Sequence, residues 1–183
     1  MATIKAESRR MCFDTFTTPV GTLIVVQDEQ GLRYIDFQDG PNPLTPMDSW
    51  QRDTHFCQAA REQLLAYFAS ELLRFELPLA PIGTAFQQRV WRVLAQVPYG
   101  TTMTYGEMAQ QLNQPSASRA VGMANGRNPL AIVLPCHRVV GANRTLTGYR
   151  GGLPIKTCLL KLEGLAIDEP KGLVIDEQAR ISP

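Results

Sequence analysis

Cys136 and His137 are the side chains best suited to chemistry, and they stand together in the run Pro135-Cys136-His137-Arg138. A cysteine attacks as its thiolate, which nearby cationic groups favour and which a histidine generates by taking the proton. Neighbouring side chains of an extended segment point to opposite sides, so we expect a water-bridged contact between the two. Glu163, at the end of the last predicted helix, is the carboxylate expected to hold the imidazole.

These residues also have structural interpretations. A buried, inert cysteine is the commonest fate of a free thiol, and His137 could be a satisfied core histidine. Cys12 and Cys57 are predicted to be core residues, as is Cys158, which falls on the apolar stripe of a helix, while His55 is predicted to be structural. The cysteines form no C-x-x-C pair, which argues against a disulfide framework or zinc knuckle and indicates a reducing cytosol.

The charge of the chain is concentrated in its second half. The whole chain of 183 residues has a net charge of +1, but residues 84–162 alone contribute +8, from nine Lys or Arg against one acid, Glu107. Residues 1–83 contribute −4 and residues 163–183 contribute −3. Such a basic stretch predicts a polyanionic partner, with a merely solvated surface as the alternative.

The elements that must position these residues fall into two groups. In the first group, the residue pattern predicts an antiparallel sheet followed by a helix, and the buried face of this helix holds Cys57, Ala60, Leu64 and Phe68. Pro78 marks an extended edge segment over residues 75–79, after the helix. The predicted strands, the loop after them and the helix cover residues 12–17, 23–26, 32–37, 40–49 and 53–69.

The second group is helical. Thr84 with Gln87 and Thr104 with Glu107 form capping boxes, each of which opens a helix. Ser116 is predicted to cap the next helix, and two short helices joined by a tight turn in a basic segment indicate a helix-turn-helix. The remaining predictions are an extended, buried Leu130–Leu134 and a last helix from Pro154 that stops at Gly164.

The charge change coincides with Pro81-Ile82-Gly83, which predicts a domain boundary there. We therefore expect an N-terminal α/β domain over residues 1–82, a DNA-binding and active-site domain over 83–166 and a tail over 167–183. The longest apolar run is too short to span a bilayer, and the polar N-terminus lacks the apolar region of a secretory signal. The sequence thus predicts a cytoplasmic protein without a membrane partner.

The sequence resembles the O6-alkylguanine-DNA alkyltransferases, also called methylated-DNA–protein-cysteine methyltransferases. The resemblance is strong over residues 84–165, whereas residues 12–80 fit only by pattern. The segments that carry it are Pro135-Cys136-His137-Arg138-Val139, Tyr105, Ser118-Arg119-Ala120-Val121-Gly122, Asn128-Pro129, Gly148-Tyr149, Gly151-Gly152, Lys156 and Leu162-Glu163-Gly164.

The resemblance implies an α+β fold, with a ribonuclease-H-like N-terminal domain of a small antiparallel sheet and helix, and a C-terminal winged helix-turn-helix. It implies irreversible, single-turnover transfer of the alkyl group from O6-alkylguanine or O4-alkylthymine in DNA to Cys136, after the nucleotide is flipped. The partner is double-stranded DNA bound through its minor groove, by a monomer, with cooperativity on DNA left open.

The resemblance also implies roles for individual residues. Cys136, His137 and Glu163 form the relay, Tyr105 donates toward N3 of guanine, and Asn128 ties the helix-turn-helix to the cysteine segment. Arg119 fills the space of the flipped base and lies with Ser118 and Ala120 on the DNA-binding helix. Tyr105, at the start of the preceding helix, also contacts DNA. The substrate pocket is formed by Pro135, Val139, Tyr149 and Arg150.

Two departures from the family pattern matter. Arg150 stands where relatives often carry a small residue, which affects pocket width or phosphate contacts. Residues 23–27 lack the Cys and His of zinc-binding relatives, so we expect neither metal nor cofactor. We also expect no additional N-terminal sensor domain, and so no combined repair and regulator protein.

Three alternatives compete with the alkyltransferase. A non-catalytic alkyltransferase-like binder of alkylated DNA would replace the reactive cysteine, so Cys136 argues against it. A helix-turn-helix transcription factor would have no need of Cys136, His137 and Glu163. A thiol hydrolase is the weakest, because a cysteine and histidine adjacent in sequence do not build its dyad.

Overall fold

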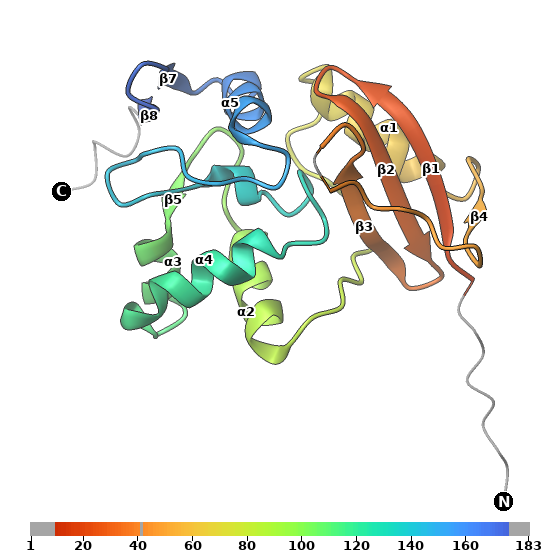
Figure 1. Cartoon of the computed structure of the whole chain (residues 1–183), viewed down its shortest axis with the longest axis horizontal. Helices are drawn as coiled ribbons and strands as arrows, with labels where there is room; N and C mark the ends of the chain where they lie inside the picture. The colour runs from red at the N-terminus through yellow and green to blue at the C-terminus, as the bar shows by residue number, and fades with distance from the viewer. Residues whose placement is uncertain (1–9, 41, 176–183) are drawn as a thin grey trace, which may run out of the picture.

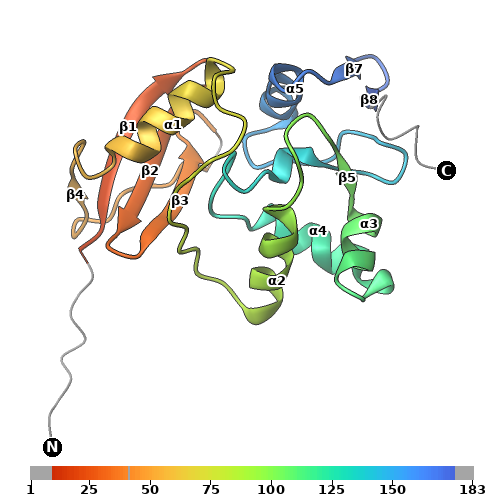
Figure 2. The same ribbon diagram turned by 180° about the vertical axis from the view of Figure 1, so that it is seen from behind.

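The computed structural model describes residues 10–40 and 42–175, which form two parts side by side (Figure 1). The N-terminal part is a sheet with helix α1 (Gln58–Phe68) across one face, behind the sheet in Figure 1 and in front of it in Figure 2. The C-terminal part consists mainly of short helices. The predicted α+β fold, an N-terminal sheet with a helix and a C-terminal helical domain, is confirmed.

The sheet has four strands in the order β3-β2-β1-β4, with β4 parallel to β1 and the other pairs antiparallel. The strands are β1 (Cys12–Thr18), β2 (Gly21–Asp28), β3 (Gly31–Phe37) and β4 (Gln51–Arg52). The first three occupy the predicted segments. Gly21 has φ +101 in the tight turn between β1 and β2, where a side chain would be strained. The two-residue β4 is too short to leave a periodic signal and was not predicted.

Helix α1 begins later than predicted, at Gln58. The Asp53 carboxylate accepts from the backbone N–H of Phe56 at 2.9 Å, which holds the preceding residues in a turn instead of a helix. The buried face also differs by one position: Tyr67 is fully buried and Phe68 is half-buried. That rotation brings the Tyr67 hydroxyl toward the C-terminal part.

The outer edge of β3 is covered by two later segments of the chain, one before and one after the start of the C-terminal part. Leu32 exchanges backbone hydrogen bonds with Pro78 and Ala80, which confirms the predicted extended edge segment. Further along, the Ile35 N–H donates to Pro129 O at 2.8 Å, and Ile35 O accepts from Ala131 N at 3.2 Å. Both sets of bonds protect a strand edge that would otherwise be open, and those of Ile35 fasten the two parts together.

The C-terminal helices begin where the capping boxes predict. Thr84 and Thr104 each accept from the backbone N–H three residues on and receive the reciprocal side-chain bond. The prediction that Ser116 caps the next helix is wrong, because Pro115 opens a 3₁₀ turn and Ala117 precedes the helix without a side-chain cap. The elements are α2 (Ala85–Leu94), α3 (Tyr105–Gln111), the 3₁₀ turn η1 (Pro115–Ala117) and α4 (Ser118–Gly126).

The predicted extended conformation of Leu130–Leu134 is also wrong. This segment folds back on itself, with Leu134 N–H donating to Leu130 O and Val133 N–H donating to Ala131 O, each at 2.9 Å. Ile132 therefore has φ +72, a strained conformation for a β-branched residue. The Asn128 side chain draws the ends of the segment together by accepting from Leu130 N–H at 2.9 Å and donating to Leu134 O at 2.8 Å.

The chain then runs through a 3₁₀ turn and a small parallel sheet to its last helix and hairpin. The elements are η2 (Cys136–Arg138), β5 (Met103–Thr104), β6 (Val139–Val140), α5 (Leu153–Leu162), β7 (Ala166–Asp168) and β8 (Leu173–Ile175). Residues 176–183 of the expected tail lie outside the described residues. No helix in the described ranges is long and apolar enough to cross a membrane.

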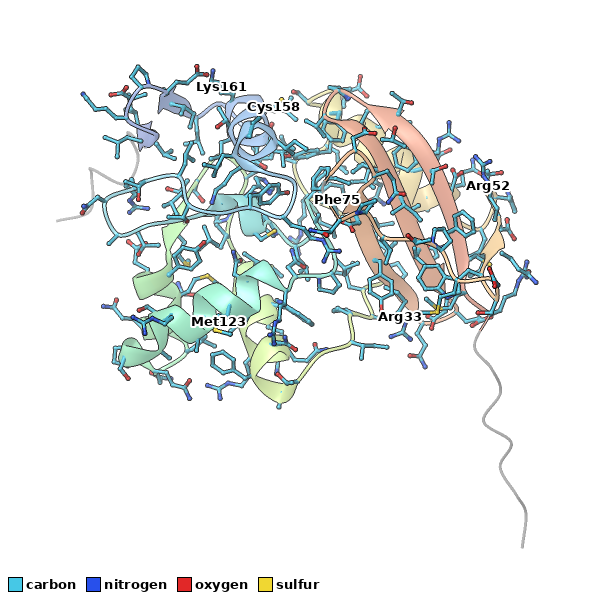
Figure 3. All side chains as sticks on the ribbon, viewed as in Figure 1. Arg33, Arg52, Phe75, Met123, Cys158 and Lys161 are labelled. Carbon is cyan, nitrogen blue, oxygen red and sulfur yellow. The ribbon has the colours of Figure 1, made fainter. Side chains whose placement is uncertain are left out.

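Cys158 was predicted to lie in the core, but it is exposed on α5, where Figure 3 labels it. The buried face of α5 is formed by Lys156, Leu159 and Leu160. A lysine holds this core position because its ammonium group donates to Val139 O at 2.6 Å and to Thr147 O at 3.1 Å. The apolar pattern alone could not anticipate a satisfied buried lysine.

Candidate active site

The segment around Cys136 is held by two successive tight turns. Pro135 has φ −80 and ψ 63, and Cys136 N–H donates to Leu134 O at 2.7 Å, which closes a γ-turn around the proline. Proline suits this position because its ring presets φ. Cys136 and His137 then lie in η2 and not in the extended chain assumed from the sequence. Both side chains are buried.

His137 contacts the carboxylate predicted for it. Its Nε2 lies 2.7 Å from Oε1 of Glu163, and both side chains are completely enclosed. Its Nδ1 is buried and forms no hydrogen bond with any described residue. This ring nitrogen, on the side away from Glu163, is the one able to accept a proton.

Glu163 is the centre of a larger network. Arg138 donates to it twice, from Nε at 2.8 Å to Oε2 and from Nη2 at 2.9 Å to Oε1. The Tyr67 hydroxyl donates to Oε1 at 2.7 Å, and Gly100 N–H donates to Oε2 at 3.2 Å. Arg138 and Tyr67 were not predicted as site residues, and no local pattern marks Tyr67, which reaches the site from α1 of the other domain.

The protonation states follow from burial and from this network. Burial lowers the pKa of His137 below its usual value, and the hydrogen bond and charge of Glu163 only partly oppose this. Burial raises the pKa of Glu163, but the hydrogen bonds and charges of His137 and Arg138 outweigh it and lower the pKa to about 2. At neutral pH the pair is a neutral imidazole beside a carboxylate.

Cys136 is a protonated thiol in this setting. Burial raises its pKa, and the opposing effects of the Asn128 side chain and the Lys156 and Arg150 charges do not reverse the shift. The neighbouring cations favour the thiolate, as expected from the sequence, but their effect on the pKa is smaller than that of burial. Desolvation of the sulfur dominates, so a base must remove the proton when the thiol reacts.

Cys136 lies on a cavity of about 430 Å³, a volume within the range of small-ligand sites. The lining residues are Tyr105, Gly122, Asn125, Gly126, Asn128, Ala131, Cys136, Gly148, Tyr149 and Arg150. Two buried polar atoms there, Oδ1 of Asn125 and the Tyr149 hydroxyl, have no hydrogen-bond partner among the described residues. Buried polar atoms without partners are unusual and mark a surface prepared for a polar ligand.

The structure thus brings five predicted residues into one cavity: Tyr105, Asn128, Cys136, Tyr149 and Arg150. Tyr105 is anchored by a 3.1 Å hydrogen bond between its hydroxyl and that of Thr147. Its position at the start of α3 is set by β5, which pairs Met103 and Thr104 with Val139 and Val140 directly after the cysteine turn.

The other predicted residues lie outside the cavity lining. Val139 is buried beside the cavity segment but is not part of the lining. Pro135 lines a larger hollow of about 740 Å³, together with Arg138 and without Cys136. On α4, Arg119 and Ala120 are exposed and Ser118 is half-buried. Met123, one turn beyond Arg119, is 58% exposed and is labelled on α4 in Figure 3.

The described residues contain no cluster of three or more His, Cys, Asp or Glu side chains arranged to hold a metal ion. The groups that the site offers for chemistry are the thiol of Cys136, the imidazole of His137 and the carboxylate of Glu163. A buried thiol that is followed in the chain by a neutral histidine, itself oriented by a carboxylate, supplies the components of nucleophilic catalysis.

The fold and the site define a two-domain protein with a thiol pocket inside a helix-turn-helix domain. Residues 85–165 match the family model of the 6-O-methylguanine DNA methyltransferase DNA binding domain, and residues 11–81 match that of its ribonuclease-like domain. The chain belongs to the 6-O-methylguanine DNA methyltransferase family.

Relatives and solved structures agree with this assignment. The chain is 52% identical, over 154 residues, to a methylated-DNA–protein-cysteine methyltransferase of Methanosarcina acetivorans, covering 84% of this chain and 99% of the relative. It is similar to the crystal structure of Mycobacterium tuberculosis OGT in complex with DNA, with a TM-score of 0.77 and 45% identity over 83% of this chain and 92% of the other.

Proposed function

We propose that this protein repairs alkylated DNA directly, by moving the alkyl group from O6 of guanine, or O4 of thymine, to its own Cys136. The observation that carries the proposal is the position of the Cys136 thiol on a base-sized cavity, with the neutral His137 and the ionised Glu163 behind it. Membership in the family and the DNA complex of the M. tuberculosis relative support DNA as the partner.

The transfer is a displacement whose atoms balance without a cofactor. A water molecule carries the thiol proton from Cys136 to Nδ1 of His137, and Glu163 stabilises the imidazolium that forms. The thiolate attacks the alkyl carbon, the carbon–oxygen bond breaks and a thioether forms. The thioether cannot be reversed by thiol exchange, so each protein molecule acts once.

The leaving guanine has to be protonated or hydrogen-bonded to depart. Tyr105 would donate toward N3, the backbone N–H of Arg150 would donate to O6, and the carbonyls of Cys136 and Val139 would accept from the exocyclic amine. Val139 O already accepts from Lys156, but a carbonyl oxygen has a second lone pair. Asn128 is assigned to the cysteine turn, which its hydrogen bonds support.

The nucleotide must leave the duplex to reach the cavity, because the reacting atom is inaccessible inside the stack. We assign Arg119, exposed on α4, to the space that the base vacates, and Ser118 and Ala120 to contacts in the minor groove. Small side chains there allow the helix a close approach to DNA.

The location, the oligomeric state and the domain bounds of the protein complete the proposal. We propose a cytoplasmic monomer that acts on chromosomal DNA, with cooperativity on DNA left open. We also propose a division into residues 1–82, 83–166 and 167–183, with the boundary at the charge change.

The decisive experiment is the intact mass of the protein after incubation with an oligonucleotide that carries one O6-methylguanine, followed by peptide mapping. We expect one methyl-for-hydrogen increment on the Cys136 peptide, in at most one equivalent, and none in Cys136→Ser. A Cys158→Ser variant, which removes an exposed thiol, is the matched control and should react normally. Tight binding to the lesion with no mass change would instead indicate a sensor of alkylated DNA.

A further inference from the structure

Arg150, the residue that departs from the family pattern, is tied to the N-terminal domain. Its Nε donates to Oδ1 of Asp36 at 2.8 Å, and its Nη2 donates to Oδ2 at 2.7 Å. The Asp36 side chain is only 4% exposed and that of Arg150 is 42% exposed. A bidentate ion pair of this kind fixes the orientation of the guanidinium as well as its distance from the carboxylate.

Two further contacts next to this ion pair fasten the loop that contains Arg150, residues 148–152, to strand β3. The rings of Phe37 and Tyr149 pack edge to face, with centroids 5.8 Å apart. Gly151 lies so close that a Cβ there would stand 2.9 Å from the Phe37 ring. The preceding strand residue, Ile35, holds the segment that leads to Cys136 through its backbone bonds to Pro129 and Ala131.

Three consecutive residues at the end of β3 therefore contact two walls of the cavity. Ile35 fixes the wall that leads to the cysteine, whereas Asp36 and Phe37 fix the loop over residues 148–152. That loop contains no helix or strand of its own, so external contacts must define its position. The distance between the two walls is the width available to an alkyl group.

We propose, on the basis of the function proposed above, that Asp36 is a positioning residue which clamps Arg150 and so sets the width of the alkyl pocket. The clamp keeps the Arg150 backbone N–H directed at the substrate oxygen. It favours small alkyl groups over bulky ones, because a wider pocket would require the loop to move away from β3. The N-terminal domain thereby contributes to substrate selection although it lies outside the helix-turn-helix.

The competing role for Arg150 is a contact with a DNA phosphate. The two roles make different predictions for Asp36. If Arg150 contacts a DNA phosphate, removing the Asp36 charge should leave DNA binding unchanged or strengthen it, because the arginine is then released from its ion pair. If Arg150 serves as a clamp, loss of either partner should have the same effect on the pocket.

The test measures alkyl-transfer rates to Cys136 from free O6-methylguanine and free O6-benzylguanine, without DNA. Asp36→Asn and Arg150→Ala are each expected to raise the benzyl-to-methyl rate ratio roughly tenfold. The double variant should raise it no further, because both single changes break one interaction. Placing the charges in reverse, with Asp36→Arg and Arg150→Asp together, should restore part of the wild-type ratio.

Asp28→Asn is the matched control. It removes the charge that Asp28 contributes to its buried ion pair with Arg33, which is labelled in Figure 3. The other groups to which Arg33 donates, Gln30 and the backbone carbonyl of Ala80, lie outside residues 148–152. This variant should lose stability without a change in the rate ratio. Should Asp36→Asn fail to fold, Arg150→Ala and Arg150→Lys still decide the question, since that side chain is partly exposed.

An unchanged ratio in Arg150→Ala, with normal transfer by the wild type, would overturn the clamp. So would a loss of duplex affinity confined to the Arg150 variants, which would identify a phosphate contact. Absence of transfer by the wild-type protein is a different result: it would overturn the proposed function itself and is distinguished by the mass measurement on Cys136.

Discussion

The Cys136 thiol is deeply buried, and burial is what keeps it protonated and unreactive until a substrate fills the cavity. Its pKa is raised by desolvation, whereas desolvation lowers the pKa of the adjacent His137. The two shifts oppose spontaneous formation of the thiolate–imidazolium pair. Glu163 reduces the cost of that pair because its carboxylate already lies 2.7 Å from the imidazole.

Replacement of His137 tests whether this residue accepts the proton of the Cys136 thiol. His137→Gln should slow transfer from a free O6-alkylguanine about 10²–10⁴-fold at neutral pH, the usual contribution of a general base. The rate of the variant should rise with pH, because hydroxide then forms the thiolate, whereas the wild-type rate should depend on pH less. A stopped-flow pH profile checks this, and parallel profiles for the two proteins would contradict a proton-accepting role.

Glu163 also links folding to pH. Its pKa is about 2 in the folded protein against 4.5 for an ordinary glutamate, so it stabilises the fold fully above pH 4.5. That stability, roughly 3 kcal/mol from the pKa difference, is lost as the pH falls from 4.5 toward 2. His137 acts in the same direction from pH 6.5 downward, because its folded pKa is lowered and protonation favours the unfolded chain.

Denaturant unfolding of the wild type should therefore show a free energy that declines on acidification below about pH 6. Glu163→Gln should be less stable at pH 7 and should lose less stability between pH 5 and pH 3. Glu62→Gln, on the exposed face of α1, is the control and should follow the wild-type curve. A wild-type slope retained in Glu163→Gln would show that the acid sensitivity arises elsewhere.

Helix α4 presents different residues to the core and to solvent. Val121 and Ala124 are buried, and the Trp91 indole N–H donates to Ala124 O at 3.0 Å, which locks α4 against α2. Arg119 and Met123 lie four residues apart on the exposed surface, one turn along the same side. Because the helix is anchored from behind, it can present a rigid surface to DNA.

Arg119→Ala should weaken repair in duplex DNA at least tenfold, yet change transfer from a free guanine analogue by less than about twofold. The reason is that a duplex lesion requires flipping, which costs a few kcal/mol, and a free base does not. Arg92→Ala, an exposed arginine on α2, should reduce affinity without this difference. Equal losses on both substrates in Arg119→Ala would remove the flipping role.

The positive charge that the folded molecule presents at its surface is smaller than the net charge of the basic stretch indicates. Of the nine basic residues in 84–162, Arg138 and Lys156 are buried, and Arg144, Arg150 and Lys161 form ion pairs. The four that are exposed and form no ion pair within the described part of the chain are Arg89, Arg92, Arg119 and Arg127. Among the basic residues of 84–162, these four are therefore the exposed ones whose charge no ion pair neutralises, and they can act on phosphates.

Non-specific DNA affinity should accordingly fall with salt along a log–log slope of roughly −2 to −4, at about −0.9 per phosphate contact. A titration by fluorescence anisotropy between low and moderate salt measures this slope. The net charge of +8 over residues 84–162 would have predicted about −7. A slope that steep would mean that the internal ion pairs open on DNA, and a flat response would remove the electrostatic argument.

Local signals explain which parts of the fold were predictable. The first three strands and the capping boxes at Thr84 and Thr104 depend on residues a few positions apart, so the sequence predicts them directly. The turn over Leu130–Leu134 was misjudged because side-chain bonds from Asn128 override the extended preference of an apolar run. Cys158 was misplaced because Lys156 turns a different face of α5 inward.

Cys136, His137, Glu163 and the helix-turn-helix were predictable from the chain alone, because each prediction depends on residue type at short or family-specific spacing. The protonation of the thiol, the hydroxyl that Tyr67 brings from α1 and the ion pair of Asp36 with Arg150 were not predictable without the folded structure. These depend on burial and on contacts between residues about a hundred positions apart, which become defined only when the two domains pack together.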